Sequence, residues 1–133
     1  MDAQQSRIAR DCHEAGRRGG LAFPEAVARL AAAGFEGYAV DFRRNTTTYY
    51  APQGDSVVLD DPGAGGAVAA AFDQPAIAAA VREAQANRPG YSYQGFCAKV
   101  KGAGCAGYLV SFPGRRVVYF GRTAETHVEH FPD

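Results

Sequence analysis

The chain has 133 residues, of which 47% are hydrophobic, so it is long and apolar enough for one domain with a real core. Its fourteen basic residues balance fourteen acidic ones, which excludes a whole-chain field that would draw it to nucleic acid or to an anionic membrane. The longest alanine-rich run, at residues 67–80, is interrupted by Asp73, Gln74 and Pro75, so we expect no bilayer-spanning helix.

The N-terminal segment and the cysteines bear on the compartment. The first eighteen residues are polar and charged, without the apolar stretch of a secretory signal. Three cysteines, an odd number, argue against a disulfide framework. We therefore expect a cytoplasmic protein without a cofactor and without a membrane or nucleic-acid partner.

The first half of the chain is predicted to form two helices followed by three strands. Pro24 suits the first turn of a helix, and Gly34 can end that helix by taking a positive φ. After Gly34 the apolar residues recur with a period of two, which places Tyr38, Val40 and Phe42 on one face of a strand. The predicted elements are helices at about 3–16 and from Pro24 to Gly34, and strands at 37–42, 46–51 and 56–59.

A Pro/Gly-rich connector, Asp60–Gly66 (DDPGAGG), separates the two halves. A glycine-rich loop can hold a phosphate group. This one lacks the Lys-Ser/Thr pair of a P-loop and the spacing of a dinucleotide fingerprint. We therefore interpret it as a linker.

The second half is predicted to repeat the order of the first. Asp73 and Ser92 are candidate helix N-caps, and Gly104 is a candidate C-terminal cap. The predicted elements are helices from Asp73 to about Asn87 and at 93–103, and strands at 107–112, 117–120 and 126–131.

Residues Phe23–Ala51 align without a gap with Tyr93–Gly121, with eight identities in 29 positions. Unrelated segments of this composition would share about two or three. We therefore predict one α+β domain over residues 1–133, with internal repeats at about 3–59 and 73–131. The halves are expected to join into one antiparallel sheet with its helices on one face and approximate two-fold symmetry.

Glu125, His127 and Glu129 are the candidates for acid/base chemistry. At alternate positions of the last predicted strand, their side chains share one face. The face has one histidine and no further ligands that the sequence places, so we predict no metal site. The alternatives are a small hydrolase or isomerase site, in which His127 acts with Glu125 or Glu129, and an exposed strand face. We interpret the set as an exposed face, since Val57 and Leu59 replace His127 and Glu129 in the first half.

Two cysteines, Cys97 and Cys105, are interpreted as small apolar core residues. Val27 and Phe35 occupy the matching positions of the first half. The alternative is a nucleophilic cysteine that acts with His127.

Four tyrosines occupy matching positions in the two halves. Large rings on a sheet bury much area, which favours a structural role. The alternative is a pocket at the seam between the halves, where the rings would meet and Arg43 and Arg115 would lie on neighbouring turns. Such a pocket would suit a small anionic or aromatic ligand. The tyrosines are Tyr38, Tyr49, Tyr108 and Tyr119.

The strings VDFRRNTTTYY, REAQ, GFCAKVKGAGCAGY and GRTAETHVEHFP occur in this order between Phe23 and Pro132. Together they resemble the YdfO-like family of small bacterial and prophage-carried proteins. The resemblance implies a domain of unknown function, labelled a phage envelope protein in some members, and it carries over no catalytic residues. The chain has none of the membrane features that the word envelope would require.

Two functional hypotheses follow. The first is a non-catalytic binding or regulatory module, monomeric or homodimeric, that holds a small ligand or a partner protein. The second is the small hydrolase or isomerase that uses His127. Tyrosines that recur in both halves, without a recurring histidine, favour the binding module.

Overall fold

The computed structural model describes residues 1–61 and 66–132, so residues 62–65 of the predicted linker lie outside the described part. The described residues form four helices and one six-stranded antiparallel sheet, which confirms the predicted α+β class. The helices are α1 (Ala3–Arg17), α2 (Phe23–Ala32), α3 (Gln74–Ala86) and α4 (Tyr93–Gly102). The strands are β1 (Gly37–Asp41), β2 (Thr46–Tyr50), β3 (Ser56–Asp60), β4 (Cys105–Ser111), β5 (Arg116–Gly121) and β6 (Thr126–His130).

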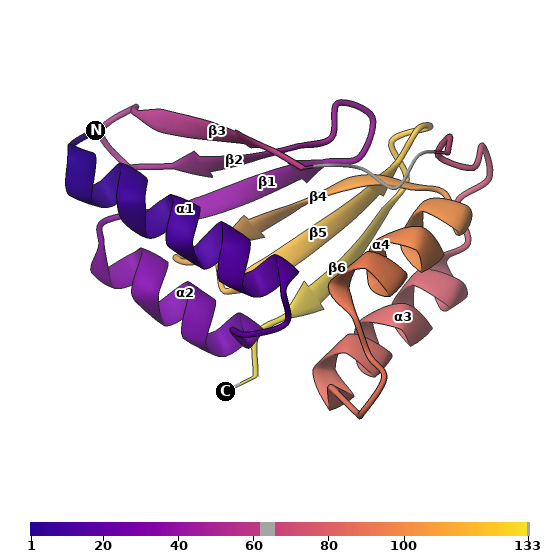
Figure 1. Ribbon diagram of the computed structural model, residues 1–133. Coiled ribbons are helices and arrows are strands. Elements are labelled where there is room, and N and C mark those ends of the chain that lie inside the picture. The colour runs from indigo at the N-terminus through magenta and orange to yellow at the C-terminus, as the bar shows by residue number, and fades with distance from the viewer. Residues whose placement is uncertain (62–65, 133) are drawn as a thin grey trace.

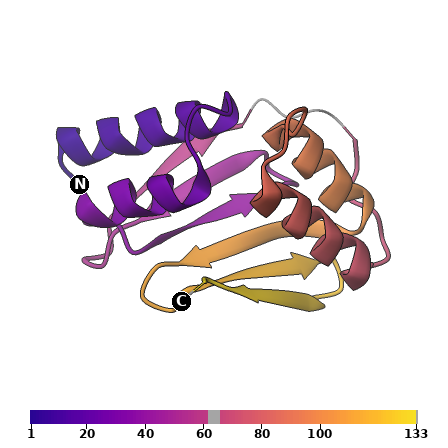
Figure 2. The ribbon, with the colours of Figure 1, turned by 90° about the horizontal axis from the view of Figure 1, so that it is seen from below.

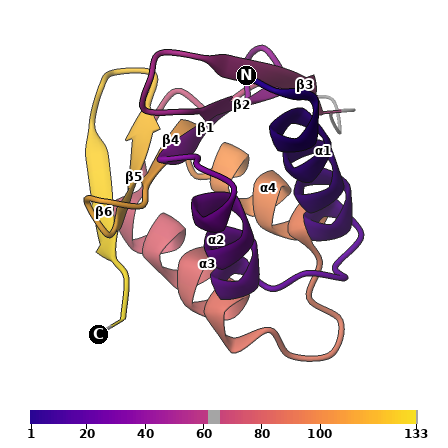
Figure 3. The ribbon, with the colours of Figure 1, turned by 90° about the vertical axis from the view of Figure 1, so that its left-hand side faces the viewer.

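The sheet has the strand order β3-β2-β1-β4-β5-β6, with β1 and β4 at its centre and β3 and β6 at its edges. All four helices lie on one face of the sheet (Figures 1 and 2), and the sheet curls around them (Figure 3). Helix, helix and three strands follow one another twice along the chain. An origin of the two halves by duplication stays a prediction.

The helix ends form where local signals predict them. The Asp73 side chain accepts a hydrogen bond from the backbone N–H three residues on, at 3.1 Å, and Ser92 makes the same contact at 3.0 Å. Gly34 and Gly104 have φ values of +99° and +92°, which confirms their positive φ directly after a helix.

Two glycines allow the central strands to meet. A Cβ atom at Gly37 would lie 2.3 Å from the carbonyl oxygen of Val110, and one at Gly107 would lie 2.3 Å from that of Val40. Both contacts are far shorter than a van der Waals contact, so any larger residue would push β1 and β4 apart. The two halves are therefore joined at a line of close backbone contact.

The core consists of two groups of buried side chains, one under each half. The first includes Ala9 and Leu30, and the second includes Ile77 and Val100. Tyr38 packs against both groups, so they meet beneath β1. None of the described helices is long and apolar enough to cross a membrane.

Candidate ligand-binding site

Six aromatic rings form a continuous row across the sheet, on the face that the helices cover. Neighbouring ring centroids are 6.2, 5.3, 6.4, 5.3 and 6.2 Å apart, so the distances are symmetric about the middle of the row. The structure thus brings the four predicted tyrosines together and adds a histidine at each end. In order, the rings are His13, Tyr49, Tyr38, Tyr108, Tyr119 and His127.

The tyrosines in this row are packing residues. Tyr49, Tyr108 and Tyr119 are buried, and Tyr38 is half-buried between the two core groups. Burial raises the pKa of all four hydroxyl groups, so they stay protonated at neutral pH. Rings buried in this way fill the space between sheet and helices and offer a ligand little surface.

The prediction that Arg43 and Arg115 lie on neighbouring turns is wrong. The central strands are antiparallel, with Gly37 opposite Ser111 and Asp41 opposite Gly107. The turn after β1 and the turn after β4 therefore lie at opposite ends of the sheet. Both arginines are exposed, and the Arg115 guanidinium lies 5.7 Å from the ring centre of Phe131. The two arginines cannot line one pocket.

The prediction of an exposed face around His127 is also wrong. Its side chain is only 12% exposed, because β6 turns this face toward the helices. Its Nε2 atom lies 2.5 Å from a carboxylate oxygen of Glu129, and its Nδ1 atom lies 2.8 Å from the side-chain nitrogen of Gln74 on α3. Glu125 does not join them, and its carboxylate accepts a hydrogen bond from Thr123 at 2.5 Å.

This arrangement suits a structural histidine better than a catalytic one. A general acid or base must reach the proton that it transfers in the substrate. Both ring nitrogens of His127 are already engaged within the protein. The ring is held as a link between the edge strand and α3.

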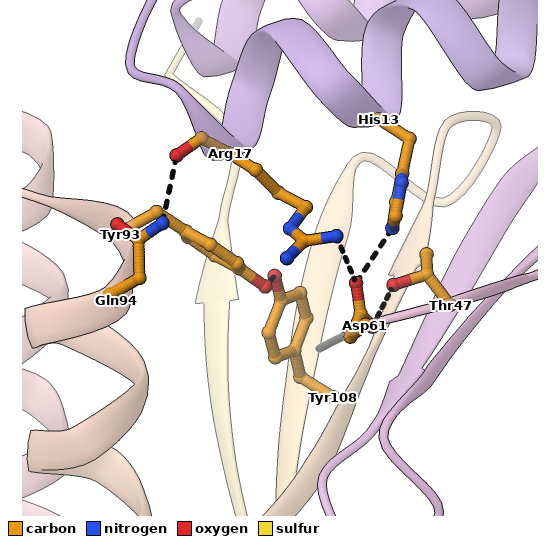
Figure 4. Close-up of polar contacts among 7 residues, drawn as sticks. All are labelled: His13, Arg17, Thr47, Asp61, Tyr93, Gln94 and Tyr108. Atoms are coloured by element: carbon orange, nitrogen blue, oxygen red, sulfur yellow. Dashed lines mark hydrogen bonds and ion pairs between the residues drawn. The ribbon is translucent and has the colours of Figure 1, made fainter. Parts of the chain in front are cut away.

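A second polar cluster, which the sequence analysis missed, lies at the other end of the ring row (Figure 4). The Nε2 atom of His13 on α1 lies 2.6 Å from Oδ1 of Asp61, just after β3. The Thr47 hydroxyl donates to Oδ2 of Asp61 at 2.7 Å, and Arg17 Nη1 lies 4.0 Å from Oδ1. The cluster therefore ties the C-terminal part of α1 to the sheet.

The Asp61 carboxylate is both sheltered and stabilised. Burial by itself raises its pKa. The hydrogen bonds from His13 and Thr47, with the charges of His13 and Arg17, outweigh burial and hold the pKa below its ordinary value of 3.8. Asp61 is therefore ionised at neutral pH. Among the described residues, no group of three or more His, Cys, Asp and Glu side chains could hold a metal ion.

A cleft of about 220 Å³ opens beside this cluster, between the end of α1 and α4. The Gln94 side chain spans the two helices by donating to the Arg17 carbonyl oxygen at 3.1 Å. Apolar side chains from β1 and α4 supply part of the lining, and charged and polar side chains from both halves supply the rest. Lining residues include Arg17, Val40, Asp61, Tyr93, Cys97 and Lys101.

The cysteines occupy different environments. Cys105 is fully buried, as predicted for a core residue, whereas Cys97 is half-buried in the cleft wall. Burial is the largest cause that raises the pKa of each of these thiols to about 11. Both are therefore protonated at neutral pH and poorly suited to act as nucleophiles. His127 does not line the cleft that contains Cys97.

One sequence signal could have led to the missed cluster. His13 lies in the first predicted helix, and Arg17 follows four residues later, one residue beyond its predicted end. This spacing puts two side chains on one face if the helix continues. Their partner Asp61 lies 48 residues after His13, in a segment whose composition indicates only a linker. The pairing depends on where β3 ends relative to α1, which no local pattern specifies.

No family model matches the chain, and no curated protein matches it. The resemblance to the YdfO-like family therefore stays a prediction.

Proposed function

We propose that this protein is a non-catalytic binding module that holds a small ligand in the cleft between α1 and α4. The observation that carries the proposal is the convergence of four separate segments on one hollow. Arg17 comes from α1, Val40 from β1, Asp61 from the segment after β3 and Cys97 from α4. A hollow with an apolar part and a few fixed polar groups is the usual form of a small-molecule site.

Two observations favour binding over catalysis. The His127 nitrogens are both engaged, and the Cys97 thiol is protonated at neutral pH.

A second hollow, of about 470 Å³, lies between α1 and α2, but its lining comes from the first half alone. The cleft beside Asp61 is supported better, because residues of both halves contribute to it.

We further propose a cytoplasmic location, since three free thiols suit a reducing compartment. A link to prophage-carried proteins rests on the sequence resemblance alone.

A thermal-shift screen with a library of small metabolites tests the proposal. A ligand that binds only the folded state raises the melting temperature. Ala98→Phe should abolish the shifts, because Ala98 lines the cleft and a phenyl ring would fill it. Ala79→Phe is the matched control: it also replaces an exposed helical alanine, but this residue does not line the cleft.

The expected result is at least one compound that stabilises the wild type and Ala79→Phe but not Ala98→Phe. If every stabilising compound acts equally on Ala98→Phe, or if no compound stabilises the wild type, the proposed function is wrong.

A further inference from the structure

We infer that the cleft binds a small carboxylate with an apolar body, and that Arg17 is the residue that binds the carboxylate. The inference rests on the proposed function and names its ligand class. It follows from the contacts of Arg17, the position of Asp61 and the size and lining of the cleft.

Arg17 has donor capacity to spare. A guanidinium carries five N–H donors in one plane. Among the described residues, the charged contact of the Arg17 side chain is the one with Asp61, at 4.0 Å, the outer limit of an ion pair. The side chain is 25% exposed and lines the cleft. Its remaining N–H groups are therefore available to a bound anion.

Asp61 is held by partners other than Arg17. His13 and Thr47 contact its two oxygens at 2.6 and 2.7 Å, much closer than Arg17 does. Asp61 can therefore steer the guanidinium without occupying its donor edge. In Figure 4, the Arg17 side chain extends from α1 toward Asp61, past the paired hydroxyls of Tyr93 and Tyr108.

The carboxylate of Asp61 beside Arg17 favours a single negative charge on the ligand at this end of the cleft. A dianion bound at Arg17 would also lie near the ionised Asp61, and like charges at short range repel. A carboxylate carries one charge, and its two oxygens match the planar fork of a guanidinium. A carboxylate is therefore preferred over a doubly charged phosphate.

The remaining lining suits an apolar body. Val40 on β1, Phe42 directly after this strand and Ala98 on α4 contribute hydrocarbon surface. A cavity of about 150 Å³ can hold benzene. A cleft of about 220 Å³ therefore has room for one ring together with a carboxylate.

The test is an NMR titration of ¹⁵N-labelled full-length protein with benzoate, benzamide, benzylamine and inorganic phosphate. Benzamide keeps the size of benzoate without its charge, and benzylamine reverses the charge. The variants are Arg17→Gln and its matched control Arg18→Gln. Both remove one positive charge from the end of α1, but Arg18 is exposed and does not line the cleft.

Benzoate should shift the amide signals of cleft residues in the wild type and in Arg18→Gln. The initial slope of shift against benzoate concentration should fall at least about tenfold in Arg17→Gln, the loss expected for a charge-assisted hydrogen bond. Arg17→Lys keeps the charge but not the planar fork, so its slope should lie between those of the wild type and Arg17→Gln. It also serves as the test if Arg17→Gln does not fold.

Several results would overturn the carboxylate inference. These are benzamide, benzylamine or phosphate binding as tightly as benzoate, equal benzoate slopes in Arg17→Gln and Arg18→Gln, or no benzoate binding to the wild type. If Ala98→Phe still blocks a compound from the metabolite screen, the cleft remains a ligand site and only the carboxylate assignment fails. If the screen fails as well, the proposed function fails with it.

Discussion

The two ends of the ring row are alike in packing and different in construction. His13 and His127 each lie 6.2 Å from a tyrosine ring and pair with a carboxylate, at 2.6 and 2.5 Å respectively. His127 and Glu129 come from one edge strand, whereas His13 comes from α1 and Asp61 from the segment after β3. The pairing of His13 with Asp61 therefore joins distant parts of the chain, whereas that of His127 with Glu129 lies within one strand.

This difference decides which end has a candidate site. At the His127 end, Gln74 occupies the second ring nitrogen and the side chains link the strand to α3. At the His13 end, the carboxylate also lies near Arg17, which faces a cleft shared by both halves. Similar packing thus gives a structural link at one end of the row and a candidate binding site at the other.

The largest expected effect comes from the glycines that follow α2 and α4. A Cβ atom at Gly104 would lie 2.1 Å from the backbone oxygen of Ala71, whereas one at Gly34 would meet only the flexible Gln5 side chain, at 3.0 Å. Both glycines have positive φ, so alanine adds about 1 to 2 kcal/mol of backbone strain at each. We expect Gly34→Ala to lower the free energy of unfolding by about 1 kcal/mol and Gly104→Ala by about 3 kcal/mol, since overpacking adds to the strain.

Urea denaturation of the two variants, side by side with the wild type, gives both values. Equal losses would show that the chain around Ala71 moves aside without cost, and the backbone contact at Gly104 would then have no energetic importance.

The next effect concerns the His13 end of the row. We expect His13→Ala to lower the free energy of unfolding by about 2 kcal/mol, because it removes a hydrogen bond to a sheltered carboxylate. His13→Gln can keep a donor near Asp61 and is expected to lose less. The measurement is urea denaturation at pH 7. A loss below about 0.5 kcal/mol for His13→Ala would show that the cluster does not stabilise the fold.

At the opposite end, His127→Ala is expected to lower the free energy of unfolding by about 1 kcal/mol. The His127 side chain is sheltered, and both of its ring nitrogens are hydrogen-bonded. It lies on an edge strand, however, and its partner Glu129 is 23% exposed, so water can hydrate that carboxylate once the imidazole is removed. His130→Ala, on the exposed face of the same strand, is the matched control and should change little. If both variants behave alike, His127 has no structural role, and the comparison of the two ends no longer holds.

The sequence predicted the elements well, because their signals are local. Asp73 and Ser92 cap helices where expected, and alternating side chains locate the strands. It did not predict the candidate site, because His13 and Asp61 meet only through the tertiary fold. The prediction that Arg43 and Arg115 are neighbours failed because β1 and β4, the first strands of the two halves, pair antiparallel. The turns that follow these strands must therefore lie at opposite ends of the sheet.

The smallest expected effect is the pH dependence of the Asp61 contacts. The pKa of Asp61 in the folded protein lies below its ordinary value of 3.8. As the pH falls, the unfolded chain therefore takes up a proton at this carboxyl before the folded protein does. The resulting stabilisation is complete above about pH 4 and is lost as the pH falls through the lowered pKa of the folded state.

Asp61→Asn cannot titrate, so its free energy of unfolding should fall less steeply than that of the wild type below about pH 4. Asp60→Asn removes the same charge one residue earlier, at an exposed position, and controls for general charge effects. Urea denaturation from pH 7 down to pH 2 measures the three slopes. If Asp61→Asn and Asp60→Asn change the slope equally, the contacts of Asp61 with His13, Thr47 and Arg17 do not favour its ionised form.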